Sequence, residues 1–181
     1  MNNNNHPIRQ QESHHGVLLN IAGEGVLLIG EAGIGKSSLA LDFLHDGHAL
    51  IADDCIDFII NKHQVVIGHC PSMLVGLLHT RELGLILLSD LFHPRAWQDS
   101  IPLNYVIRLQ KIPVRSESLS ITAEHYTVCN QSFPMLTLNV NNPATIHNRI
   151  NTWLNMQTKH NNAVTTLNQR HKIQLNAHRI L

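Results

Sequence analysis

The segment from Gly30 to Ser37 limits the folds that this chain can adopt more than any other segment does. Its sequence, GEAGIGKS, fits the pattern G-x-x-x-x-G-K-[ST] without substitution. The glycines allow backbone conformations that other residues avoid, so successive N–H groups can turn toward phosphate oxygens. The lysine can neutralise the β- and γ-phosphates, and the serine hydroxyl can ligate Mg²⁺. The pattern therefore predicts a phosphate-binding loop that leads into the N-terminus of a helix.

The residues on either side of this loop support the prediction. Before it, Val26–Ile29 is a fully apolar run, which is typical of a strand buried on both faces, and Val17–Ile21 is a further strand candidate. After it, Lys36 to about His45 carries apolar residues on one helical face. His48–Ala52 then has the composition of a strand. We therefore expect the order strand, loop, helix, strand.

The rest of the chain contains shorter apolar segments between polar ends. Residues 1–14 are predicted to be a disordered polar arm, residues 15–158 one domain, and residues 159–181 a polar C-terminal helix or tail. Helices are expected at Pro71–Leu78 and within 143–158. Further strands are expected at Ile56–Ile60, Val65–Ile67, Leu85–Leu88, Val106–Leu109, Leu119–Thr122, Tyr126–Val128 and Leu136–Val140.

Composition excludes several classes of protein. The 13 basic and 13 acidic residues cancel, so the chain has no strong global field for nucleic acid or for an anionic membrane. No apolar run approaches the roughly 18 residues of a membrane span, and no secretory signal is visible. The 3 cysteines, an odd number without a CxxC pair, fit a reducing compartment. We therefore expect a cytoplasmic protein without nucleic-acid or membrane partners.

Two adjacent carboxylates follow the second predicted strand. Asp53 and Asp54 come directly after the apolar run that succeeds the phosphate loop and its helix. In open α/β sheets, strand ends face the ligand crevice. One carboxylate could hold Mg²⁺ while the other accepts a proton from an attacking hydroxyl. Repulsion between the two charges would raise the pKa of one of them.

The segment from His15 to Asp54 resembles the catalytic domain of HPr kinase/phosphorylase, the bacterial serine kinase of the phosphocarrier protein HPr. Residues 47–54, GHALIADD, match the strand GH-x-L-(I/V)-A-D-D of that family at the family's spacing from the loop lysine. Residues 71–84 resemble its signature segment more weakly, with Pro71, Leu77, Leu78, Arg81, Leu83 and Gly84 in place. The resemblance covers residues 15–90 well and the remainder poorly.

The resemblance implies an α/β fold, a P-loop kinase-type domain of the HPr kinase and PEP carboxykinase-like kind, with a mixed sheet and flanking helices. It implies that Asp53 is the base that deprotonates the acceptor serine, and that Ser37 and Asp54 hold the metal. It implies that His15 faces the transferred phosphate and that Arg81 stabilises transferring charge. The nucleotide phosphates would be bound by Gly30, Glu31, Ala32, Gly33, Ile34, Gly35, Lys36, Ser37 and Ser38.

The same resemblance implies ATP and Mg²⁺ as cofactors, an HPr-type phosphocarrier as the protein that is phosphorylated, and a homo-oligomer, typically a hexamer. It is closest to short proteobacterial family members, which consist of the catalytic domain alone. The reverse reaction, phosphorolysis of the phosphorylated carrier, is left open by the sequence.

Departures from the family pattern keep alternatives open. His79 stands where the signature has glutamate, Glu82 where it has glycine, and Ser38 where an acidic residue is usual. A histidine cannot replace a carboxylate as a ligand of a hard metal without changing the site. One alternative is therefore a nucleotide-binding regulatory module without transfer chemistry. Another is a small-molecule kinase or a plain NTPase.

Overall fold

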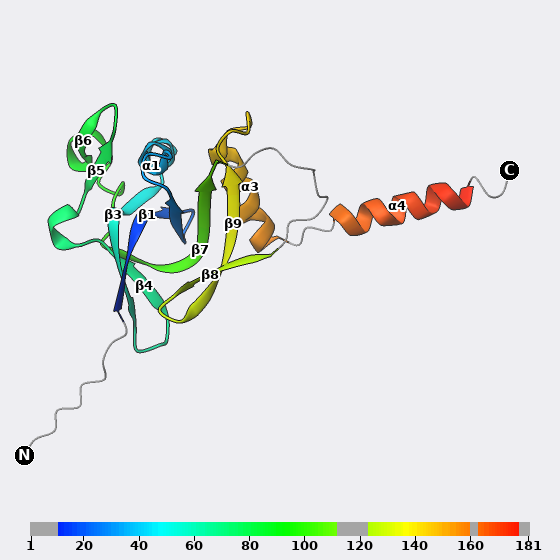
Figure 1. Cartoon of the computed structure of the whole chain (residues 1–181), viewed down its shortest axis with the longest axis horizontal. Helices are drawn as coiled ribbons and strands as arrows, with labels where there is room; N and C mark the ends of the chain where they lie inside the picture. The colour runs from blue at the N-terminus through cyan, green and yellow to red at the C-terminus, as the bar shows by residue number, and fades with distance from the viewer. Residues whose placement is uncertain (1–10, 112–122, 160–162, 178–181) are drawn as a thin grey trace, which may run out of the picture.

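The structure is a computed structural model that describes residues 11–111, 123–159 and 163–177 (Figure 1). Strand β1 (Gln11–Ile21) forms an antiparallel hairpin with β2 (Glu24–Gly30), and β2 runs into the phosphate loop. Helix α1 (Lys36–His45) begins where the loop ends, and β3 (Ala49–Ile60) returns beside β1. The predicted order of strand, loop, helix and strand is confirmed.

Within the described residues, one mixed sheet of 7 strands, in the order β2-β1-β3-β4-β7-β9-β8, forms the body of the molecule. The pairs β2–β7 and β7–β9 are parallel and the others are antiparallel. Strand β7 pairs with β4 through its first residues and with β2 further along, so β2, β1, β3, β4 and β7 form a closed circuit of paired strands. The added strands are β4 (Val66–His69), β7 (Ser100–Gln110), β8 (Glu124–Val128) and β9 (Gln131–Asn139).

Apolar side chains of the sheet belong to two separate hydrophobic core clusters. Val26 and Leu28 of β2 pack on the side of α1 and of α3 (Ile146–Thr158), whereas Leu27 and Ile29 pack in the other cluster. The prediction of a β2 strand buried on both faces is therefore confirmed. Burial of each leucine contributes about 2 kcal/mol, which holds the strand that leads into the phosphate loop in place.

A small unit outside the main sheet replaces the helix predicted for residues 71–78. Only a 3₁₀ turn, η1 (Ser72–Leu74), forms there. The chain then turns at Gly76, where φ is 71°, and extends as β5 (Leu77–Thr80). Among the strands that the structure describes, β5 pairs with β6 (Gly84–Leu87) alone, and β6 continues into the short helix α2 (Leu88–Leu91). The helix prediction was wrong because cross-strand pairing with β6 overrides the local signal at the proline.

The N-terminal end of the chain differs from the sequence prediction, whereas the described C-terminal residues form a helix as predicted. Residues 11–14, assigned to the polar arm, are the first residues of β1 and pair with β3, whereas the strand expected at Leu119–Thr122 lies outside the described residues. Near the C-terminus, Ala163–Ala177 forms helix α4, which extends away from the sheet (Figure 1). No helix in the described ranges is long and apolar enough to cross a membrane.

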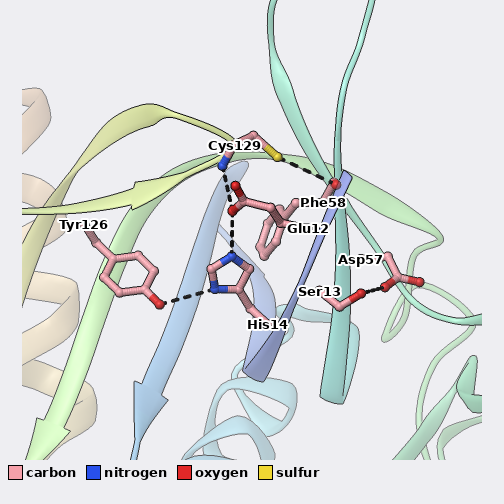
Figure 2. Close-up of polar contacts among 7 residues, drawn as sticks. All are labelled: Glu12, Ser13, His14, Asp57, Phe58, Tyr126 and Cys129. Atoms are coloured by element: carbon pink, nitrogen blue, oxygen red, sulfur yellow. Dashed lines mark hydrogen bonds and ion pairs between the residues drawn. The ribbon is translucent and has the colours of Figure 1, made fainter. Parts of the chain in front are cut away.

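Polar contacts tie the start of β1 to the β8–β9 hairpin (Figure 2). The Glu12 carboxylate accepts a hydrogen bond from the backbone N–H of Cys129 at 2.9 Å, and Nε2 of His14 lies 3.1 Å from the same oxygen. Nδ1 of His14 lies 3.2 Å from the Tyr126 hydroxyl, and the Cys129 thiol donates to the Phe58 carbonyl at 3.7 Å. These contacts explain why a polar segment is held in the sheet.

Replacing Glu12 with glutamine should reduce the loss of stability in acid. Hydrogen bonds from Cys129 and His14 hold the pKa of Glu12 below its ordinary value of 4.5. A carboxyl with a lowered pKa stabilises the folded state above its unfolded pKa and loses that contribution as pH falls through the folded pKa. We expect Glu12→Gln to lower Tm by about 1–3 °C at neutral pH and by less near pH 3. Thermal melts at both pH values test this, with Glu82→Gln on an exposed turn as the control.

Candidate active site

The loop between β2 and α1 has the backbone geometry that its sequence predicts. Gly30, Gly33 and Gly35 adopt positive φ angles of 148°, 75° and 106°. No side chain caps the N-terminus of α1, so its first N–H groups are directed at the space above the loop. Nζ of the buried Lys36 donates to the carbonyls of Gly30 at 3.0 Å and Glu31 at 3.1 Å. This combination of N–H groups, helix dipole and ammonium fits a phosphate chain.

A cavity of about 470 Å³ opens above this loop. Its walls come from the loop and the start of α1, from His15 on β1, from Asp54 on β3 and from residues 79–83 of the β5–β6 hairpin. The structure thus brings together segments that are far apart in the sequence. Of the predicted site residues, the cavity wall contains His15, Ala32, Gly33, Gly35, Lys36, Ser37, Ser38, Asp54 and Arg81, whereas Gly30, Glu31, Ile34 and Asp53 lie outside it.

Asp53 is a buried carboxylate held by two donors. Its side chain is only 6% exposed. The Ser37 hydroxyl donates to Oδ1 and the backbone N–H of His79 donates to Oδ2, both at 2.9 Å. Burial raises the pKa of Asp53, and the hydrogen bonds from His79 and Ser37 oppose that rise. The carboxylate is therefore fixed behind the loop serine, out of contact with the open cavity.

Asp54 follows Asp53 within β3, so neither aspartate lies at the strand end that the sequence predicts, and the environment of Asp54 differs from that of Asp53. Its backbone adopts a φ of 68°, and its side chain is 63% exposed. Nδ1 of His15 donates to the Asp54 carbonyl at 2.9 Å and lies 4.0 Å from its carboxylate. Because Nδ1 is the donor, Nε2 of His15 is left as the acceptor in the neutral ring. The two aspartates are thus adjacent in the sequence but lie in different environments, with the Asp53 carboxylate buried and the Asp54 carboxylate exposed.

The turn of the β5–β6 hairpin lies directly over the phosphate loop. The Arg81 guanidinium packs so closely on Gly33 that a Cβ at position 33 would collide with it. Arg81 therefore lines the cavity directly beside the loop. His79 and Glu82, which depart from the signature, line the same wall.

Gly33→Ala should therefore disturb the loop and the hairpin together. An alanine must adopt a φ of 75° and displace the Arg81 guanidinium. We expect Tm to fall by about 2–4 °C and nucleotide affinity to fall with it. Gly23→Ala is the matched control, because Gly23 has a φ of 94° with open space around it and lies outside the cavity. Equal effects on nucleotide affinity in both variants would contradict the prediction.

The predicted site residues do not include six residues of the cavity wall: Leu41, Asp42, His79, Thr80, Glu82 and Leu83. Leu41 and Asp42 lie one helical turn beyond Ser37 and Ser38, so the helical period could have indicated them. Thr80 precedes Arg81 at the end of β5, and only the hairpin pairing reveals its position. The phosphate end of the cavity was thus easier to predict than the hairpin side.

The chain is similar to known proteins in both sequence and structure. The family model described as HPr Serine kinase C-terminal domain matches residues 7–172. Proteins named HPr kinase/phosphorylase from Burkholderia cenocepacia (strain HI2424) and Paraburkholderia phymatum are each 37% identical over 115 residues, which is 59% of this chain. The match spans only 36% of the length of those relatives.

A solved structure is similar over nearly the whole chain. The HPr(Ser) kinase/phosphatase from Coxiella burnetii matches with a TM-score of 0.71 and 25% sequence identity. The match covers 93% of this chain and 98% of that one. The similarity therefore includes the main sheet as well as the phosphate loop.

Proposed function

Because the chain belongs to the family of HPr serine kinase C-terminal domains, we propose that it transfers the γ-phosphoryl group of ATP to a serine hydroxyl of an HPr-type phosphocarrier protein. One observation carries the proposal. A single open cavity combines an anion-binding loop, an exposed carboxylate and an arginine, which are the groups that phosphoryl transfer to a hydroxyl requires.

The residues beside the loop fit Mg²⁺. The Ser37 hydroxyl and the Asp53 carboxylate, joined by a hydrogen bond, are the oxygen donors that a hard cation prefers. Within the described residues, no group of three or more His, Cys, Asp or Glu side chains could hold a metal unaided. That agrees with a Mg²⁺ held by few protein ligands together with substrate phosphates. When bound, Mg²⁺ neutralises charge on the transferred group.

The geometry favours an exchange of the two aspartate roles that the family resemblance implies. Asp53 is buried against Ser37, so its carboxylate is better placed to help hold Mg²⁺ than to contact a protein acceptor. Asp54 is exposed in the cavity, so an incoming hydroxyl can reach it. We therefore propose Asp54 as the base and Asp53 as the metal-side carboxylate.

The remaining groups then have distinct tasks. Lys36 and the loop N–H groups hold the phosphate chain, and Arg81 stabilises charge on the transferred group. The oxygen of the acceptor hydroxyl attacks phosphorus in line with the leaving oxygen, and Asp54 accepts the proton of that hydroxyl. His15 positions Asp54 through the hydrogen bond to its carbonyl.

Labelled ATP tests the proposal directly. The protein is incubated with γ-labelled ATP, Mg²⁺ and an HPr-type carrier, and label is expected on a carrier serine. Release of phosphate without labelled carrier would instead indicate an NTPase. Incubating the phosphorylated carrier with inorganic phosphate tests phosphorolysis in the same assay.

His79 supports a second candidate function. Its ring stands in the cavity wall where the family signature has a carboxylate, and Glu82 replaces a signature glycine on the same turn. A regulatory module that binds nucleotide without transfer would retain the loop and lose this acid. It predicts calorimetric ATP binding without turnover, and gain of transfer in His79→Glu. Transfer by the wild-type protein would exclude it.

We also propose a homo-oligomer, as the family resemblance implies. Analytical ultracentrifugation at micromolar concentration should give a mass well above the 20.3 kDa of one chain. A monomer under these conditions would contradict this part of the proposal without affecting the proposed chemistry.

A further inference from the structure

The β5–β6 hairpin carries leucines on both faces. On the inner face, Leu78 and Ile86 are paired across the strands and buried at 0% and 7% exposure. On the outer face, Leu85 and Leu87 of β6 are 67% and 44% exposed, and Leu87 is paired with Leu77 of β5. An exposed, contiguous apolar surface of this kind marks an interaction site more often than an isolated apolar residue does.

This outer surface is continuous with the cavity. Leu85 lies opposite His79 in the strand register, and His79 lines the cavity wall. Leu83, on the turn, is 65% exposed and lines the cavity as well. Because alternate residues of a strand share a face, Leu85 and Leu87 continue the exposed apolar surface along β6 from the turn at Leu83. We name Leu77, Leu83, Leu85 and Leu87 the leucine face.

We propose that the leucine face docks the protein acceptor, through an apolar surface of the acceptor that borders the hydroxyl to be phosphorylated. This inference rests on the proposed function. A small substrate would be enclosed by the cavity and would have no contact with leucines beyond its mouth. A protein whose hydroxyl enters the cavity must cover the surface next to it, and the hairpin beside α1 is part of that surface (Figure 1).

The character of the leucine face also specifies the chemistry of the partner. Its four members are apolar, and the neighbouring outward side chain within the hairpin is His79. The described charges of the hairpin, Arg81 and Glu82, lie on the turn at the cavity and are of opposite sign. An acceptor with an apolar helix or loop next to its hydroxyl therefore fits the leucine face. Charged side chains in that place would lose their hydration and find no hydrogen-bond or ion-pair partners on the leucine face.

Threonine substitutions test the docking. Leu85→Thr, Leu87→Thr and the double variant keep strand propensity while removing apolar area. The control is Leu167→Gln on α4, whose leucine is 52% exposed and remote from the cavity wall. With an HPr-type carrier, we expect KM to rise about 5- to 20-fold in each single variant, with kcat and ATP affinity within about twofold of wild type. Fluorescence anisotropy of a labelled carrier should report the same loss of binding.

The outcomes separate this inference from the proposed function. Transfer by the wild type with an unchanged carrier KM in the double variant would overturn the docking role and leave the kinase function standing. A wild type that neither binds nor phosphorylates the carrier would overturn both. A fall in oligomer mass by ultracentrifugation in the double variant would assign the leucine face to a second copy of the chain and overturn the inference. Thermal melts verify that each variant is folded.

Discussion

Lys36→Ala is expected to weaken ATP binding by about 100-fold and to abolish measurable phosphoryl transfer. The Nζ atom is held by the carbonyls of Gly30 and Glu31 at the floor of the cavity, so its charge is fixed before any ligand arrives. A preorganised charge of this kind stabilises a phosphate chain without a reorganisation cost. Isothermal titration with Mg²⁺ and a non-hydrolysable ATP analogue measures the loss.

Two controls make this experiment specific. Lys62→Ala removes an exposed lysine on the turn between β3 and β4 and should leave ATP affinity unchanged. Lys36→Arg keeps the charge but cannot reproduce the compact ammonium between the two carbonyls, so we expect an intermediate affinity. Wild-type affinity in Lys36→Ala, with an unchanged melting curve, would exclude the loop as the nucleotide site.

The two aspartates should give opposite phenotypes when each is changed to asparagine. Asp54→Asn is expected to lower kcat by about 10²–10⁴ with ATP affinity nearly unchanged, because it removes only a proton acceptor at the open side. Asp53→Asn is expected to weaken Mg²⁺-dependent nucleotide binding by about 10- to 100-fold, because its amide group cannot accept both donated hydrogen bonds. Titrations at several Mg²⁺ concentrations, combined with carrier kinetics, separate the two effects.

Asp57→Asn on the same strand is the control, since Asp57 bonds Ser13 outside the cavity (Figure 2). It should leave both kcat and the Mg²⁺ dependence unchanged. The reverse pattern, with lost transfer in Asp53→Asn and lost Mg²⁺ dependence in Asp54→Asn, would restore the assignment that the family resemblance implies. It would also show that an exposed carboxylate beside His15 is insufficient to identify the base.

Local patterns explain why the phosphate loop and its flanking elements could be predicted. An apolar run, a glycine-rich motif and an amphipathic helix are each recognisable within a few residues. The β5 strand could not be found in this way, because its identity depends on pairing with β6 across a turn. The start of β1 could not be found either, because Glu12 is anchored by Cys129, a partner more than 100 residues away in the sequence.

Only part of the candidate site is encoded in local sequence patterns. The sequence predicts Asp53 and Asp54 as a pair at a strand end, whereas β3 continues to Ile60 and Asp54 adopts a φ of 68° within it. The Asp53 carboxylate is held by the Ser37 hydroxyl and the backbone N–H of His79. The Asp54 backbone is held by His15 instead. A motif alone therefore identified the pair but not the task of each member.

The closed circuit of strands bears on how the protein that is recognised could change between members of one family. The loop, His15 and both aspartates sit on β2, β1 and β3, which are locked to one another by the circuit. The β5–β6 hairpin is a separate two-stranded sheet that pairs with no other strand in the part of the chain that the structure describes. Substitutions on the outer surface of this hairpin can alter the protein that is recognised while the phosphate chemistry stays intact. The hairpin thus contributes Arg81 to the cavity through its turn, while the outer face of its strands is left to vary separately from the loop and the aspartates.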